Sequence, residues 1–423
     1  MGRTVGLLLI PVLVIGLTAA DTVDEPDPAT VAAQQAAAAE FFDFPAPESI
    51  ADLAPGTVLD TREVAVSVGA GEMNPLLTLP LTATQIMYRT TDVLGRPSAA
   101  VTTVLRPQDV PGSSTGRAVM YASYYDSLDP ADSPSRAIAG MPVSDASNID
   151  GELAIVAGLL LAGETVIMPD IQGERGIFAV GEEYAHITLD ALRAAAASPD
   201  SPYTDDMPTV LAGYSGGAIA AAWSATLVAD YAPELADSIV GVSQGGLMVT
   251  PEHNLDYVAE SSTWSGVAGM AFIGMTRAYG VDLDPYLTEG GRRILATLDG
   301  MIIGEAKHLF DHLRWSDLFR PEFAGPDDIP EIRRILDDTD LSARAVPPYP
   351  QLIVQGTGGE EDDTPDSPTL GGGDGVMLVR DVRDYVRVLE DAGVDVDYRE
   401  VSDSHGPAGA QWARFTADWI GNL

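Results

Sequence analysis

Apolar segments typical of buried strands alternate with helical segments along most of the chain, and this alternation limits the possible folds more than any other feature. Runs such as VLAGY and LIVQG are apolar on both sides, as in strands that are covered on both faces. Helices between successive strands supply that cover in a parallel sheet. We therefore expect an α/β fold whose mostly parallel sheet carries helices on both faces.

The alternation assigns a type to each segment of the main body. Two strands are expected in residues 85–107, around the turn sequence LGRP. A later helix shows its period in one apolar stripe, made of Leu378, Val379, Val382, Tyr385, Val386 and Leu389. Further strands are expected at residues 116–126, 164–170, 208–214, 238–246, 350–357 and 394–401, and helices at 151–163, 188–198, 216–232, 376–393 and 408–420.

The alternation stops between residues 250 and 348, where helical segments follow one another with no strand between them. An insertion of apolar-faced helices between two strands is typical of a lid over an active site at the edge of a sheet. A plain structural elaboration is the alternative interpretation. We therefore divide the main body into an α/β core at residues 41–249 and 347–423 and a helical cap at residues 250–346.

The N-terminal residues have the order of a secretory signal, with one arginine, an apolar run from Val5 to Leu17, and small residues before Asp21. The apolar run of ~13 residues is short for a hydrocarbon core ~30 Å thick. We expect a signal peptide at residues 1–20, a mobile spacer at residues 21–40, and a secreted protein with no stable membrane insertion after signal removal. An uncleaved anchor in the cell envelope is the alternative.

The net charge is −40, from 63 acidic and 23 basic residues, and one of the basic residues is a lysine, Lys307. Such a charge repels nucleic acids and anionic lipid headgroups, so neither is expected as a partner. The absence of cysteine excludes disulfides, a cysteine nucleophile and a lipid-acylated N-terminal cysteine. No metal-ligand cluster or phosphate-binding loop stands out in the sequence, so we expect no metal and no cofactor. The oligomeric state is left open.

Ser215 lies in the sequence GYSGG, which fits the pattern G-x-S-x-G between an apolar strand and a small-residue helix. In this pattern a strand turns sharply into a helix at a strained residue, and the glycines remove side chains that would collide across the turn. The hydroxyl then projects at the carboxyl end of the sheet, where the Gly216 N–H can face an oxyanion. We expect a nucleophile at Ser215. The alternative is a glycine-rich turn in which the serine is a helix N-cap.

A serine nucleophile needs a base, and His405 is the histidine that follows the last predicted strand. It lies in the sequence SDSHGPAG, which we interpret as a loop. The other four histidines have structural interpretations, since His186 opens a predicted helix and the predicted cap contains His253, His308 and His312. We therefore expect His405 to be the base. A solvent-exposed loop histidine is the alternative.

The third member of such a site is a carboxylate that orients the imidazole and stabilises its charged form. It is expected after the predicted strand 350–357, in the sequence TGGEEDDTPDSPTLGGGDG. The residues alone do not choose among the acids there, which are Glu360, Glu361, Asp362, Asp363, Asp366 and Asp374. Most of them would otherwise belong to a solvated loop, and Asp374 would be a helix N-cap.

Taken in order, these motifs resemble the secretory lipases of fungi and actinobacteria, the yeast lipase A type. The resemblance covers nearly the whole chain after the predicted signal. It is carried by FFDFPAPESIADLAPGTVL, LGRPSAAVTTVLRP, YASYYDSLDPADSPS, MPDIQGE with LDALRAA, GYSGGA, SIVGVSQGGLMV, QGT and the histidine segment. It implies an α/β-hydrolase fold with a helical cap, and hydrolysis of carboxylic esters, of lipids above all, without a metal or cofactor.

By position, the resemblance implies Ser215 as nucleophile, His405 as base, and Gly216 and Asp126 as oxyanion residues. An aspartate helps an oxyanion if it is protonated, or if it positions the loop. A simple turn residue is the alternative interpretation of Asp126.

The chain departs from the family pattern by lacking disulfides and by an insertion between QGT and the following helix. Counting back from that helix favours Asp374 as the acid, and counting forward from the strand favours the cluster at residues 360–363. We choose Asp374. The resemblance therefore implies an exported serine esterase or lipase that acts on a small-molecule or lipid ester. An exported peptidase of the same fold and a non-catalytic lipid-binding protein are the alternatives.

Overall fold

The computed structural model describes residues 35–36, 38–68, 77–106 and 115–423. The predicted signal peptide and most of the predicted spacer at residues 21–40 lie outside the described residues. The described end of that spacer is helical, and Ala38 and Phe41 in this helix are buried. Among the described residues, none of the helices combines the length and the apolar character needed to cross a bilayer.

The described residues form a nine-stranded sheet in the order β1-β2-β3-β5-β4-β6-β7-β8-β9. Neighbours are antiparallel from β1 to β5 along this order and parallel from β5 to β9. The predicted α/β class with a mostly parallel sheet is therefore confirmed. The strands are β1 Val58–Val68, β2 Leu77–Thr91, β3 Pro97–Leu105, β4 Ala118–Ala122, β5 Thr165–Pro169, β6 Thr209–Tyr214, β7 Ile239–Gly245, β8 Gln351–Gly356 and β9 Val396–Val401.

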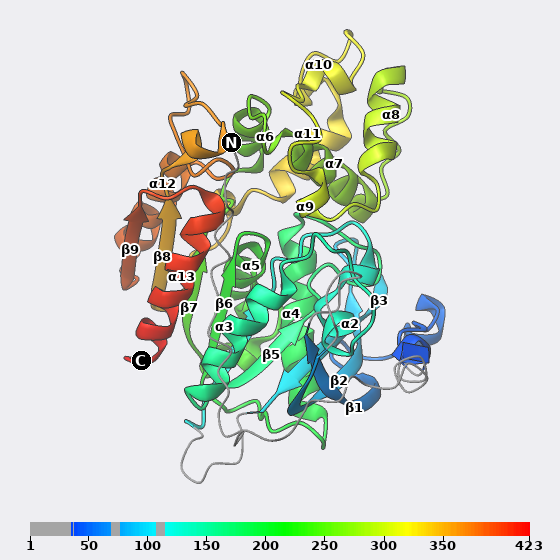
Figure 1. Cartoon of the computed structure of the whole chain (residues 1–423), viewed down its shortest axis with the longest axis vertical. Helices are drawn as coiled ribbons and strands as arrows, with labels where there is room; N and C mark the ends of the chain where they lie inside the picture. The colour runs from blue at the N-terminus through cyan, green and yellow to red at the C-terminus, as the bar shows by residue number, and fades with distance from the viewer. Residues whose placement is uncertain (1–34, 37, 69–76, 107–114) are drawn as a thin grey trace, which may run out of the picture.

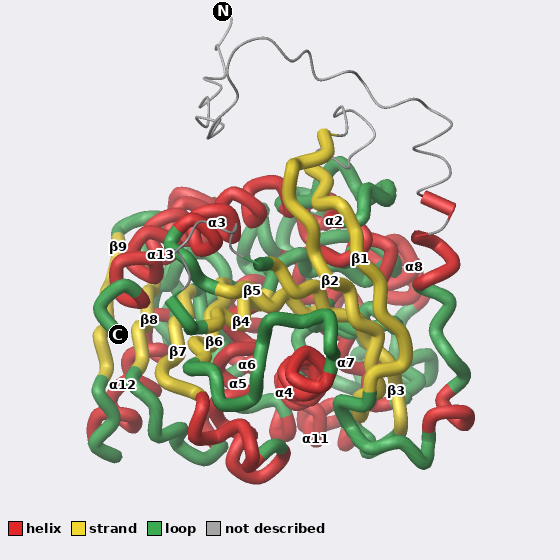
Figure 2. Tube along the Cα trace, turned by 90° about the horizontal axis from the view of Figure 1, so that it is seen from below, coloured by secondary structure: helices red, strands yellow, loops and turns green. Residues whose placement is uncertain are grey.

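Helices cover both faces of the sheet (Figure 2). One face carries α2 Pro134–Ile138, α3 Ile149–Leu161 and α13 His405–Ile420, and the other carries α4 Gly181–Ala197, α5 Gly216–Tyr231 and α12 Val379–Asp391. Side chains of a strand alternate between the two faces. In β6, Val210 and Ala212 pack in the core under α3 and α13, whereas Leu211 packs in the core under α4 and α5. This double burial explains why the central strands carry apolar residues on both faces.

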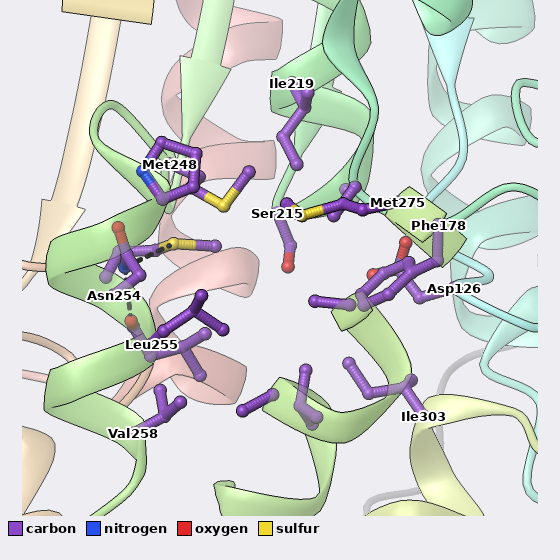
Figure 3. A pocket seen from close by; sticks show the side chains of 18 residues that line it. Asp126, Phe178, Ser215, Ile219, Met248, Asn254, Leu255, Val258, Met275 and Ile303 are labelled. Carbon is purple, nitrogen blue, oxygen red and sulfur yellow. Dashed lines mark hydrogen bonds between the residues drawn. The ribbon is translucent and has the colours of Figure 1, made fainter. Parts of the chain in front are cut away.

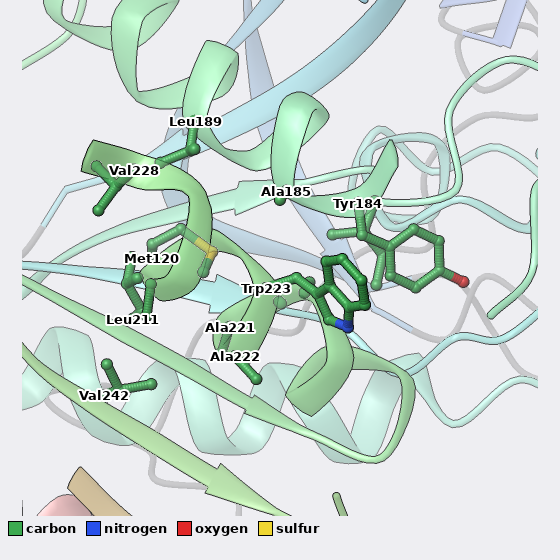
Figure 4. Close-up of a cluster of buried hydrophobic side chains, with 14 of the residues drawn as sticks. Met120, Tyr184, Ala185, Leu189, Leu211, Ala221, Ala222, Trp223, Val228 and Val242 are labelled. Carbon is green, nitrogen blue, oxygen red and sulfur yellow. The ribbon is translucent and has the colours of Figure 1, made fainter. Parts of the chain in front are cut away.

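The helices on the second face pack closely because their contact residues are small. Alanines of α5 lie around Trp223, which packs beside Tyr184 and Ala185 of α4 (Figure 4). A Cβ on Gly181, at the start of α4, would lie 2.2 Å from the Trp223 Nε1, so this position admits no larger residue. The predicted apolar stripe of α12 is also buried along its whole length. The core thus holds β6 and α5 firmly, and the turn between them carries the candidate nucleophile.

Helices with no strand between them connect β7 to β8, in the segment predicted as a cap. They lie beyond the carboxyl ends of the parallel strands, at the top of Figure 1. They have an apolar core of their own, in which Phe272, Trp315 and Phe319 stack or meet edge to face. These helices are α6 Pro251–Val258, α7 Ser265–Tyr279, α8 Glu289–Leu298, α9 Ile303–Ala306, α10 Trp315–Leu318 and α11 Pro330–Asp338.

Candidate active site

Ser215 is the residue between β6 and α5, at the carboxyl end of a central strand. Its backbone has φ 53° and ψ −119°, a conformation that costs a non-glycine residue roughly 1–3 kcal/mol. Gly213 permits the turn because a Cβ there would lie 2.1 Å from the Gly217 carbonyl oxygen. The Ser215 side chain makes no capping hydrogen bond to α5, which argues against the alternative role of helix N-cap.

The structure brings Ser215, His405 and Asp374 together. The His405 Nε2 lies 2.8 Å from the Ser215 Oγ, and its Nδ1 lies 2.8 Å from the Asp374 Oδ2. All three side chains are buried. An imidazole with its proton on Nδ1 can donate to the Asp374 carboxylate while it accepts a hydrogen bond from the serine hydroxyl. This is the arrangement that prepares a serine for nucleophilic attack.

The prediction that His405 lies in a loop was wrong, because α13 begins at this residue. The sequence Gly406-Pro407 suggested a loop. The N–H groups of a first helical turn have no partner within the helix, so proline is tolerated there. The helix start also holds the imidazole in place, because the His405 N–H donates to the Asp374 carbonyl oxygen at 2.7 Å.

Asp374 is fully buried and is held by several hydrogen bonds. Its Oδ1 accepts from the backbone N–H groups of Val376 and Met377, at 3.0 and 2.7 Å. Its Oδ2 accepts from Gln355 Nε2 at 3.1 Å, besides its contact with His405. These donors fix the direction of the carboxylate. The carboxylate thus reaches the imidazole through Oδ2, and the N-cap of α12 is Leu378 and not Asp374.

The competing acids at residues 360–363 lie in another environment. They form a short 3-10 turn and its cap, and Glu360 and Glu361 are exposed to solvent. Asp362 instead accepts a hydrogen bond from Trp264 Nε1 of the cap at 3.1 Å. Among the described contacts of His405, the acid partner is Asp374 and none of this cluster. The insertion thus packs beneath the cap and leaves the imidazole to Asp374.

The two predicted oxyanion residues lie side by side. Gly216 is the first residue of α5, and Asp126 follows β4 with φ 41°. A Cβ on Gly216 would lie 1.9 Å from the Asp126 Oδ1, so this position requires glycine. Burial raises the pKa of Asp126 to about 7, although the nearby His405 charge and the Gly216 N–H favour its ionised form. A carboxyl with that pKa can be neutral when an oxyanion forms beside it.

Two buried polar residues that the sequence analysis did not single out hold the Asp126 loop. Gln172 accepts from the Ser127 N–H at 2.9 Å and donates to the Asp126 Oδ1 at 3.3 Å. Glu152 of α3 accepts from the Ser123 hydroxyl at 2.9 Å and the Tyr124 N–H at 3.1 Å, and burial raises its pKa to about 8. Buried polar side chains are retained where they satisfy other groups. The sequence signal for Glu152 was a glutamate directly before the apolar run of this helix.

Two cavities meet at Ser215. The first is apolar, lies between the core and the cap, and has a cavity volume of about 50 Å³. Figure 3 shows Ser215 at its centre, with Met248, Leu255 and Val258 on one side and Phe178 and Met275 on the other. The second cavity opens on the His405 side of the serine, is more polar, and has a volume of about 390 Å³.

The remaining histidines have structural contacts. His186 lies within α4, stacks on Tyr231, and has its pKa lowered by burial to about 4. His253 of α6 pairs with Asp381 of α12 at 2.9 Å. His308 and His312 lie in the cap with positive φ. Within the described ranges, no group of three or more histidine, aspartate or glutamate side chains is arranged to hold a metal ion.

A family model described as secretory lipase matches residues 140–366, more than half of the chain and including Ser215. The chain belongs to the secretory lipase family. This confirms the resemblance drawn from the sequence, and it makes the protein a member of a family of lipases and related ester hydrolases.

Two named proteins of similar sequence agree with the family assignment. A Mycobacterium tuberculosis protein named probable inactive lipase is 30% identical over 324 residues, which cover 74% of this chain and 69% of that protein. Lipase 6 of Candida albicans is 34% identical over 201 residues, 46% of this chain and 42% of lipase 6. The match thus spans less than half of the length of that yeast lipase.

Solved structures confirm the α/β-hydrolase fold. Candida antarctica lipase A in its closed state superposes with a TM-score of 0.70 at 22% identity, covering 86% of this chain and 80% of that one. A ligand-bound form of the rice cell wall degrading esterase LipA from Xanthomonas oryzae gives a TM-score of 0.61 at 17% identity, covering 84% and 93% of the two chains. At these identities the similarity is one of fold.

Proposed function

We propose that this member of the secretory lipase family is a serine hydrolase that cleaves carboxylic esters with an apolar, lipid-type acyl chain. The observation that carries the proposal is the pair of 2.8 Å contacts that link Asp374 to His405 and His405 to Ser215. The apolar cavity beside the serine supports an acyl chain as the group that binds there.

The reaction proceeds through an acyl-enzyme. The Ser215 Oγ forms a bond to the ester carbonyl carbon as its proton passes to the His405 Nε2. The oxyanion faces the Gly216 N–H, and Asp374 stabilises the imidazolium. The carbonyl then re-forms, the bond to the alcohol oxygen breaks, and that oxygen takes the proton from Nε2. Water attacks the acyl-enzyme with His405 as base, which releases the acid and restores the serine.

The same chemistry indicates which part of the ester each cavity binds. The leaving alcohol oxygen must lie within reach of the His405 Nε2, because this atom delivers the proton. The more polar cavity includes His405 in its wall and therefore receives the alcohol part. The apolar cavity contains Gly216 and no histidine in its wall, so it receives the acyl chain. Its residues come from both the core and the cap, which gives the cap a role in acyl binding.

A serine-reactive fluorophosphonate and a panel of esters with increasing acyl length test the proposal. The probe is expected to label Ser215, as located by mass spectrometry of the digested protein, and esters are expected to be cleaved faster than matched amides. Absence of both labelling and turnover would instead support a non-catalytic lipid-binding protein, the alternative that the name of the M. tuberculosis relative raises. Faster cleavage of amides would support a peptidase.

The pH profile of kcat/KM is expected to fall on both sides of a maximum. At acid pH His405 takes up a proton and can no longer accept the serine proton. The pKa of Asp126 is raised to about 7, so this carboxyl is neutral below that pH and charged above it. The charged form repels the oxyanion and competes for the Gly216 N–H. Activity is therefore expected to fall as the pH rises above about 7.

Asp126→Asn provides the control for the fall of kcat/KM at alkaline pH, since its amide stays neutral at every pH. We expect the variant to lose the alkaline decline and to keep the acid decline, measured with one ester across the pH range. An unchanged alkaline decline in Asp126→Asn would show that another group is responsible.

We further propose that the protein is exported by its first 20 residues, which have the order of a secretory signal. N-terminal sequencing of protein recovered from the medium of an expressing bacterium is expected to begin near residue 21. Deletion of residues 1–20 is expected to retain the protein inside the cells with unchanged specific activity. Recovery of a membrane-bound protein that still carries Met1 would favour an uncleaved anchor.

A further inference from the structure

The wall of the alcohol-side cavity contains Lys307, the single lysine of the chain. Its ammonium lies over the face of the Trp264 ring, 3.7 Å from the ring centroid. The Trp264 Nε1 donates to Asp362, so this carboxylate fixes the ring beneath the ammonium. Among the described contacts, the Lys307 ammonium has no ion pair or side-chain hydrogen bond, although the Asp362 carboxylate lies near enough to attract it. An ammonium has three donors, so those of Lys307 are free to bind a ligand.

The Lys307 ammonium lies in the same cavity as His405, the proposed base. Trp264 meets the His405 ring edge to face, at 5.4 Å between ring centroids. Lys307 and His405 therefore share one cavity wall, on the side from which the alcohol leaves. Among the described residues that line this wall, Lys307 is the one lysine or arginine, and Asp126 is the one carboxylic acid.

The net negative charge of the whole protein does not prevent Lys307 from binding an anionic ligand. The long-range field of a chain with net charge −40 repels anions. Salt at about 0.15 M screens exposed charges beyond ~8 Å, whereas contacts inside a partly buried site are screened much less. Lys307 is half-buried in the cavity wall. At ordinary ionic strength its contact with a bound ligand therefore outweighs the field of the distant acids.

We propose that the alcohol-side cavity selects esters whose alcohol part carries an anionic group, a phosphate or a carboxylate, which Lys307 binds. This inference rests on the proposed ester hydrolysis and deepens it, since it assigns a chemical class to the alcohol. A charge-assisted hydrogen bond from an ammonium to such a group is among the strong ones in proteins. The other polar lining groups, including Tyr124 and Asn148, are suited to the hydroxyls of a glycerol backbone.

The test compares three esters with the same acyl chain: octanoylglycerol, octanoylglycerol phosphate and the octanoyl ester of glyceric acid. They are assayed below their micelle concentrations in about 0.15 M salt, where long-range repulsion is screened. We expect kcat/KM to favour at least one anionic ester over the neutral one by about ten-fold, the effect of one charge-assisted hydrogen bond. The two anionic esters show whether phosphate or carboxylate is the better ligand.

Lys307→Met removes the charge and keeps an unbranched apolar side chain against Trp264. We expect this variant to bring the ratio of kcat/KM between the anionic and the neutral ester close to one. Lys307→Arg is expected to retain part of the preference. Arg314→Met is the matched control, because Arg314 is an exposed cation of the cap that pairs with Glu260 and is absent from the cavity wall. It removes the same charge elsewhere and is expected to leave the ratio unchanged.

A wild-type ratio of one or below overturns the inference, as does an unchanged ratio in Lys307→Met or an equal loss in Arg314→Met. A purely structural role of Lys307 would slow all three esters equally. If no ester is cleaved and Ser215 is not labelled, the proposed hydrolysis fails. In that case, calorimetric titration with glycerol phosphate tests binding at Lys307 independently of ester hydrolysis. Binding by the wild type that Lys307→Met abolishes supports the inference, and absence of binding overturns it.

Discussion

Ser215→Ala is expected to lower kcat for ester hydrolysis by ~10⁶, the loss typical of a missing triad nucleophile. In the described structure the His405 Nε2 has the Ser215 Oγ as its partner at 2.8 Å, so no second hydroxyl is in place to take over the attack. The fold should be unchanged, since alanine and serine carry the same steric cost at φ 53°. Steady-state kinetics on the best ester of the panel and a thermal unfolding curve measure the two effects.

Ser224→Ala is the matched control for this variant. Ser224 lies on the same helix α5, is fully buried, and its hydroxyl has no hydrogen-bond partner within the described structure. It should keep wild-type kinetics. Substantial ester hydrolysis by purified Ser215→Ala would refute the assignment of the nucleophile, whereas a loss in both variants would point to a general disturbance of α5.

Asp374→Asn is expected to lower kcat by about 10⁴. The carbonyl oxygen of the introduced amide can still accept the Val376 and Met377 N–H groups that now bind Oδ1. The amide NH₂ group then faces the His405 Nδ1 and favours the tautomer with the proton on Nε2, which cannot accept the serine proton. The protonated imidazole also loses the charge that stabilises it. The variant should therefore fold normally and turn over esters very slowly, as steady-state kinetics and a thermal unfolding curve would show.

The matching experiment changes the four acids at residues 360–363 together to their amides. Three of these residues, Glu360, Glu361 and Asp363, are exposed and none of the four binds His405 in the described structure, so kcat should fall by less than ~10-fold, as expected for screened surface charges. A mild Asp374→Asn and an inactive cluster variant would transfer the acid to the cluster. That outcome would leave the assignments of Ser215 and His405 intact.

The helices and strands that the sequence predicted are those whose apolar residues follow a regular pattern along the chain. The central strands carry apolar residues on both faces because both faces are covered, and the stripe of α12 follows the helical period. β1 was not predicted, because Asp60, Arg62 and Glu63 interrupt its apolar pattern and it pairs with β2 alone, at the edge of the sheet. The helical start at His405 was not predicted either, because glycine and proline break a helix in its interior but not in its first turn.

For the candidate site, the sequence by itself determined Ser215 and its turn, because glycine spacing and strand–helix order are local properties. It also indicated His405, through its place after the last strand. The tertiary structure decided which of six acids meets the imidazole, since Asp374 and His405 are 31 residues apart and His405 and Ser215 are 190 apart. It alone revealed Gln172 and Glu152 behind the Asp126 loop, and Lys307 in the alcohol-side wall. Side chains so distant along the chain meet through the packing of the cap and core, which no local period encodes.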